Sequence, residues 1–175
     1  VVGNEAGRVD LYGNNKLLGA NLAPQEAWLA HRGLKTLPLR MERQSRNAAV
    51  VAGWLGGHGR VAGVNFPGLS SHRQHELAGR QFGGELWGAM VSFDALAAGR
   101  GEVFRFLEAL RLIQPATTLG DVYTLALYPA MSSHRALDAA TRGRIGIGDG
   151  LIRLSIGIED PADIIADLDA ALEAM

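Results

Sequence analysis

The chain has 175 residues, of which 47% are hydrophobic and 20% are charged, and its formal net charge is −1. This composition is typical of a globular domain, and the near-neutral charge argues against nucleic acid or an anionic membrane surface as a partner. The absence of cysteine excludes disulfides, thiolate metal sites and a cysteine nucleophile, and no apolar run is long enough for a membrane span. We expect a cytoplasmic protein.

Helix and strand signals alternate along most of the chain. Pro24 begins a long amphipathic helix, which Pro38 is expected to kink or divide and which ends at Gly56. Beyond it, strands are expected at 60–65, 88–93, 123–128 and 151–156, and helices at 70–82, 101–112, 133–144 and 161–174. This alternation predicts an α+β (α/β) fold in which helices cover a small sheet.

Helix caps and one terminal pattern complete this outline. Ser70, Ser133 and Asp160 are each placed to accept the first free N–H groups of a predicted helix. At the start of the sequence, VVGNEAG has an apolar pair followed by a turn signal, as if a strand were already in progress. It is either a processed terminus or the continuation of a longer protein.

Three histidines are candidate metal ligands. His72 and His75 are three residues apart on a predicted helix, and His58 lies upstream. No carboxylate or further histidine completes a recognisable ligand pattern. Solvent-exposed histidines are therefore the better interpretation.

Two further patterns have structural explanations. The segments GWLGGHG and GIGDG lack the spacing of a phosphate loop after a strand, so turns and helix ends account for them. Ser132, Ser133, His134 and Asp138 include the residue types of a nucleophilic triad. No G-x-S-x-G elbow surrounds either serine, which favours a helix cap at Ser133.

The strongest candidate is Arg153, within the apolar segment DGLIRLSIGIED. On a strand, Arg153 and Ser155 share one face, and the intervening aliphatic residues share the other. A guanidinium binds a carboxylate through two parallel hydrogen bonds, which suits an amino-acid or organic-acid ligand. A surface-facing arginine without a ligand remains the alternative from the strand alone.

Five segments, taken in order, resemble a known family. They are GLKTLPLRMERQSRNAAVVAGWL, VAGVNFPGLSSHRQHELAGRQ, GAMVSFDAL, TLGDVYTLALYPAMSSH and DGLIRLSIGIEDPADIIADLDAAL. They resemble the C-terminal half of the trans-sulfuration enzymes, the pyridoxal-phosphate enzymes of cysteine and methionine metabolism. This resemblance implies the C-terminal domain of a fold-type I pyridoxal-phosphate enzyme, with a small, mostly antiparallel sheet covered by helices.

The resemblance also implies residue roles. Arg153 matches the arginine that binds the substrate α-carboxylate, and Thr118 matches a position, usually serine, beside the substrate and the cofactor-linked lysine. Thr117 matches a position that is often glutamate in members acting on cystathionine. A glutamate there could pair with the distal ammonium of cystathionine, which a threonine cannot do. The TLGD form of residues 118–121 is more similar to methionine γ-lyases and O-acylhomoserine sulfhydrylases. YPAMSSH departs from the HPASMTH pattern common in the family.

The resemblance places the catalytic lysine and most cofactor contacts before this chain begins. Of the 2 lysines, Lys16 and Lys35, neither has the family's catalytic context. We expect no catalytic, cofactor-binding or metal residue here, and no activity from the chain alone. By this reading residues 1–22 are the tail of a large cofactor-binding domain, 23–57 an interdomain helix and 58–175 the C-terminal small domain.

The implied activity is γ-elimination or γ-replacement on a methionine, homocysteine or O-acylhomoserine type of substrate, in a homotetramer. The sequence does not distinguish elimination from replacement. Cystathionine is the alternative substrate. A non-catalytic α+β module that binds a ligand or a partner is the alternative function.

Overall fold

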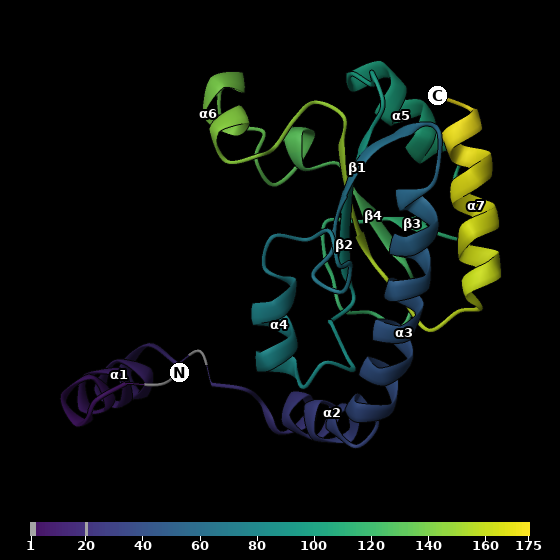
Figure 1. Cartoon of the computed structure of the whole chain (residues 1–175). Coiled ribbons are helices and arrows are strands. Elements are labelled where there is room, and N and C mark those ends of the chain that lie inside the picture. Colours follow the sequence, from purple (N-terminus) through teal and green to yellow (C-terminus); the bar gives the residue numbers. More distant parts are fainter. Residues whose placement is uncertain (1–2, 20) are drawn as a thin grey trace. The chain divides into compact units, whose positions relative to one another are not determined.

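The computed structural model describes residues 3–19 and 21–175, and the chain divides into two compact units between Pro38 and Leu39 (Figure 1). In the first unit, α1 (Glu5–Leu18) and α2 (Pro24–Leu34) contain no buried residue. No helix was expected at α1, whose glycines and paired asparagines lower helix propensity. The strand expected at Val1 and Val2 lies outside the described residues.

The long helix predicted from Pro24 is divided, as Pro38 predicted. After the break at Lys35 and Thr36, α3 (Leu37–Gly56) continues the chain. The buried stripe of α3 begins with polar residues and continues with apolar ones: Gln44, Ser45, Asn47, Ala48, Val51, Ala52 and Leu55. Such a stripe can pack an apolar core at one end and bind polar backbone groups at the other.

The second unit is built on one five-stranded sheet. Its strands are β1 (Val61–Asn65), β2 (Met90–Ala95), β3 (Gln114–Pro115), β4 (Leu125–Leu127) and β5 (Leu151–Ser155). They lie in the order β1-β2-β5-β4-β3, and every neighbouring pair is antiparallel except β3 with β4. The predicted α+β fold with a small, mostly antiparallel sheet is confirmed.

The remaining helices of the second unit follow the strands. They are α4 (His75–Phe82), α5 (Arg100–Ala109), the 3₁₀ turn η1 (Pro129–Met131), α6 (Ala139–Arg144) and α7 (Pro161–Glu173). The core lies between the sheet and α3, α5 and α7, and Figure 1 shows α3 and α7 along one side of the sheet. Phe93 of β2 meets Phe106 of α5 edge to face, with ring centroids 6.0 Å apart.

Two predicted helix starts were wrong. Helix α4 begins at His75 rather than after Ser70, and its N-cap Gln74 makes no side-chain cap. Helix α6 begins at Ala139, where the Asp138 side chain accepts from the backbone of Thr141. In both cases a run of turns occupies the residues after the serine, so the serine has no helix to cap. Asp160 does cap α7, as predicted.

Candidate functional site

The alternation of β5 places Arg153 on the sheet face opposite the core. Ile152, Leu154 and Ile156 are fully buried among the core residues, as the strand pattern predicts. Arg153 and Ser155 share the other face, where Arg153 is half-buried and Ser155 is buried. Because β5 is flanked by β2 and β4, the guanidinium rises from the middle of the sheet.

Arg153 has unused hydrogen-bonding capacity. Its Nη2 donates one long bond of 3.4 Å to the backbone oxygen of Thr118. Its Nε is buried and has no partner among the described residues. No carboxylate in residues 3–19 or 21–175 forms an ion pair with it. Burial lowers the pKa of Arg153, but an arginine stays charged at physiological pH.

This arrangement is suited to an anionic ligand. A half-buried cation without a carboxylate partner carries a desolvation cost, which a bound anion would offset. The planar fork of a guanidinium matches a carboxylate in geometry as well as charge. The site therefore favours a carboxylate-bearing small molecule.

The segment of residues 117–121, here called the Thr118 loop, lies beside Arg153 and connects β3 to β4. The side chains of Thr117 and Thr118 are exposed. Gly120 adopts a positive φ of 84°, and its N–H donates to Ser155 Oγ at 3.0 Å. The structure thus brings Arg153 and Thr118 together, while Thr117 makes no hydrogen bond to Arg153 within the described structure.

A polar patch on α3 also contacts this region, and sequence reasoning missed it. Gln44 Nε2 donates to the backbone oxygen of Asp121 at 2.6 Å. Asn47 Nδ2 donates to the backbone oxygens of Gly157 and Glu159 at 3.1 and 2.8 Å. The available signal was the helical spacing of these two amides with Ala48 and Val51, which predicts that polar side chains face the core.

The turn after β5 is joined to the segment after the Thr118 loop. The Glu159 carboxylate accepts hydrogen bonds from the backbone N–H and the hydroxyl of Thr124. Thr124 Oγ1 in turn accepts from the N–H of Gly157 at 2.9 Å, and Ile158 N–H donates to Val122 O at 2.9 Å. The strand that carries Arg153 and the loop that carries Thr118 therefore form one hydrogen-bonded unit.

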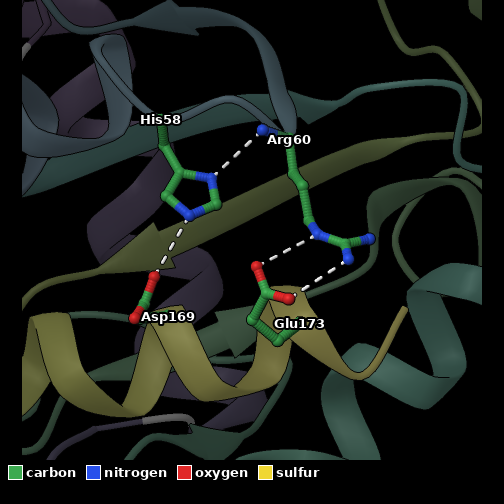
Figure 2. Close-up of polar contacts among 4 residues, drawn as sticks. All are labelled: His58, Arg60, Asp169 and Glu173. Carbon is green, nitrogen blue, oxygen red and sulfur yellow. Dashed lines mark hydrogen bonds and ion pairs between the residues drawn. The ribbon is translucent and has the colours of Figure 1, made fainter.

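The three histidines have separate surroundings. His58 Nε2 lies 3.1 Å from an Asp169 oxygen on α7, and its Nδ1 accepts from the N–H of Arg60 at 3.2 Å (Figure 2). His72 Nε2 lies 2.9 Å from Asn65 Oδ1, and His75 stacks on the ring of Trp87. Across the described ranges, no group of three His, Asp or Glu side chains is arranged to hold a metal ion.

The serine and histidine residues near α6 do not form a catalytic triad. Ser133 Oγ lies 2.8 Å from His134 Nδ1, whereas Ser132 Oγ donates to the backbone oxygen of Tyr128. Both carboxylate oxygens of Asp138 accept from Thr141. Asp138 therefore caps a helix instead of orienting His134.

The two lysines lie in the first unit. Lys16 is in the last turn of α1 and Lys35 is the C-cap residue of α2. Both side chains are exposed.

Residues 1–173 match the model of one protein family, described as Cys/Met metabolism PLP-dependent enzyme. An O-succinylhomoserine sulfhydrylase of Pseudomonas aeruginosa is 42% identical over 95% of this chain and 40% of its own length. An L-methionine gamma-lyase of Pseudomonas deceptionensis is 42% identical over 97% of this chain and 42% of its own length. The chain thus spans less than half of either relative.

Solved structures agree with the sequence comparison. The crystal structure of a cystathionine gamma synthase from Xanthomonas oryzae pv. oryzae, in complex with aminoacrylate and cysteine, superposes with a TM-score of 0.88 at 40% identity. The match covers 99% of this chain and 44% of that structure.

Within residues 3–19 and 21–175, no helix combines the length and the apolar character needed to cross a membrane.

Proposed function

Because the chain belongs to the Cys/Met metabolism family of pyridoxal-phosphate-dependent enzymes, we propose that it forms the substrate-carboxylate side of an active site in sulfur amino-acid metabolism. The proposed reaction is γ-elimination or γ-replacement on methionine, homocysteine or an O-acylhomoserine. The sulfhydrylase and methionine gamma-lyase relatives support this class of substrate.

The observation that carries the proposal is the buried Nε of the half-buried Arg153, which has no partner among the described residues. In this proposal the guanidinium binds the substrate α-carboxylate through two parallel hydrogen bonds. Holding the carboxylate fixes the direction of the α-C–H bond, and correct orientation is a large part of the rate enhancement. The Thr118 hydroxyl contacts the bound amino acid from the adjacent loop.

Thr117 bears on the choice of substrate. Its side chain is exposed and uncharged, so it provides no negative charge to pair with the distal ammonium group of cystathionine. Methionine and O-acylhomoserines have no such ammonium group. We therefore rank these substrates above cystathionine.

The cofactor is proposed to be held mainly by polypeptide outside this chain. Pyridoxal phosphate supplies an electron sink for the carbanion formed at the α-carbon. The chain offers a cation for a carboxylate, but its two lysines are exposed and lie in the unit that ends at Pro38. We accordingly propose that residues 1–22 are the tail of the cofactor-binding domain, and that the chain alone is inactive.

We further propose that the complete enzyme is a cytoplasmic homotetramer. Exposed apolar side chains on α2, among them Trp28, Leu29 and Leu34, provide surface for burial against other parts of such an assembly. Light scattering of the full-length protein tests the stoichiometry. A monomer in solution would contradict it.

The test of function is Arg153→Ala in the full-length protein loaded with pyridoxal phosphate. We expect kcat/KM to fall on the order of 10²-fold or more, since the substrate loses its charged anchor. The visible absorbance of the bound cofactor should be unchanged. Arg80→Ala, on an exposed position of α4, is the matched control. An unchanged kcat/KM in Arg153→Ala would contradict the assignment.

A further inference from the structure

We propose that Gln44 of α3 is a positioning residue for substrate binding, because it fixes the Thr118 loop relative to Arg153. The inference rests on the proposed function, in which this loop and Arg153 contact the same substrate. Gln44 does not touch the substrate in this view. It acts through the backbone of Asp121.

Burial makes the hydrogen bond between Gln44 and Asp121 costly to break. The side chain is only 1% exposed, and its Nε2 donates a short bond of 2.6 Å to the oxygen of Asp121. A buried amide that loses its partner costs more free energy than the bond itself contributes, so the pair is strongly maintained. The two residues are 77 positions apart, so the bond ties the loop to a distant helix.

The loop has few other restraints. It contains no helix or strand, and Leu119 is 56% exposed. In the described structure, three side chains from other elements bond its backbone. They are Arg153 at Thr118, Ser155 at Gly120 and Gln44 at Asp121.

The geometry of these three bonds distinguishes Gln44 from the other two. Arg153 and Ser155 both belong to β5, so their bonds hold the loop along a single strand. The residues flanking the loop are also held, Ala116 by Ala126 and Val122 by Ile158. Within the described residues, Gln44 is the one side chain that anchors the loop backbone from a helix, and it restrains displacement of the Thr118 hydroxyl away from the guanidinium.

The Arg153 bond is also the longest of the three, at 3.4 Å. If a substrate carboxylate engages the guanidinium, that weak bond to Thr118 is the one most readily given up. The loop then depends on Ser155 and Gln44 for its position. Loss of Gln44 should therefore affect substrate affinity and leave cofactor binding unchanged.

The experiment compares Gln44→Met with wild type in the full-length protein loaded with pyridoxal phosphate. Methionine preserves side-chain length and removes the donor. We expect kcat/KM for the amino-acid substrate to fall about tenfold, mainly through KM, with the cofactor absorbance unchanged. Gln81→Met, at an exposed position of α4, is the matched control and should match wild type.

A double-mutant cycle separates positioning from a general loss of stability. In an Arg153→Ala background the loop no longer has a guanidinium to be aligned with. Gln44→Met should then add little further loss, so the two effects are non-additive. Fully additive effects, or an unchanged KM in the single variant, would overturn the inference.

Two further outcomes are distinguishable. If Arg153→Ala has no effect, the proposed function itself fails. If Arg153→Ala is impaired while Gln44→Met matches wild type, only the positioning role fails. Should Gln44→Met not fold, Gln44→Asn withdraws the amide by one methylene, and the same rise in KM is expected.

Discussion

Thr124 and Glu159, 35 residues apart in the chain, are joined by two hydrogen bonds to one carboxylate. The Thr124 N–H donates at 2.6 Å and its hydroxyl at 2.9 Å. The same hydroxyl accepts from the N–H of Gly157, so one fully buried threonine fixes the turn at the end of β5. The position of Arg153 therefore depends on contacts at the end of its strand as well as on the sheet.

Gly157→Ala should destabilise the protein strongly. A Cβ at this position would meet a Glu159 carboxylate oxygen, the Val122 oxygen and the Thr124 nitrogen, and two of these are backbone atoms that cannot easily move. Overpacking of this kind costs about 1–3 kcal/mol. Denaturant unfolding measures the change.

The control for this change is Gly53→Ala on the exposed side of α3. An added Cβ meets nothing within 4 Å there. Removing a helical glycine should stabilise the protein by about 0.5–1 kcal/mol. Equal effects of the two alanines would contradict the packing argument.

Thr124→Val should also lower stability. Valine keeps the shape of threonine but removes the hydroxyl, which leaves Gly157 N–H without its acceptor and Glu159 with one bond fewer. A buried polar group left unpaired costs about 1–3 kcal/mol. Thr124→Ser retains the hydroxyl and should unfold at a higher denaturant concentration than Thr124→Val.

Arg153→Lys should show whether geometry matters beyond charge. Lysine keeps the positive charge but offers a point donor in place of the planar fork. We expect kcat/KM between those of wild type and Arg153→Ala, about tenfold below wild type. Steady-state kinetics on the full-length protein measure kcat/KM for wild type and the two variants. A lysine variant with the kcat/KM of wild type would argue against bidentate binding.

The packing of helix α7 should contribute more to the stability of the protein through its apolar face than through its ion pairs. Arg60 bonds Glu173 through two nitrogens, at 3.3 and 3.2 Å, but both side chains are about half exposed (Figure 2). Arg60→Ala should cost less than about 1 kcal/mol, and less still at high salt. Leu168→Ala, at a fully buried position, should cost about 2–5 kcal/mol in the same unfolding experiment.

The cap of α6 should weaken in acid. Hydrogen bonds from the backbone and then the hydroxyl of Thr141 hold the pKa of Asp138 below its ordinary value. The lowered folded pKa means that the cap contributes fully above the unfolded pKa, about 3.9, and is lost as pH falls through the folded pKa. An NMR titration should place the Asp138 midpoint below that of the unfolded chain. Asp138→Asn should remove the pH dependence.

Local patterns predicted those features whose causes are local. The period-2 alternation placed Arg153 opposite the core, Pro38 predicted the break before α3, and Asp160 predicted the start of α7. The order of motifs identified the family. Ser133 failed as a cap because a serine favours turns as well as helix starts, and residues 132–137 form turns.

Contacts between distant segments were not predictable in the same way. The bond between Gln44 and Asp121 depends on how α3 packs beside the loop, and no local signal fixes that. The polar residues in the stripe of α3 indicated only that some buried partner exists. Their partner is a backbone oxygen, which carries no signature in the sequence.

The sheet order has a consequence for folding during synthesis. β5 pairs with both β2 and β4, yet the ribosome makes it after the other four strands. Until residues 151–155 emerge, the antiparallel pair of β1 and β2 and the parallel pair of β3 and β4 lack the strand that joins them into one sheet. The nascent chain thus exposes the unpaired edges of β2 and β4 late in translation. Unpaired strand edges of this kind are prone to aggregation and are bound by chaperones.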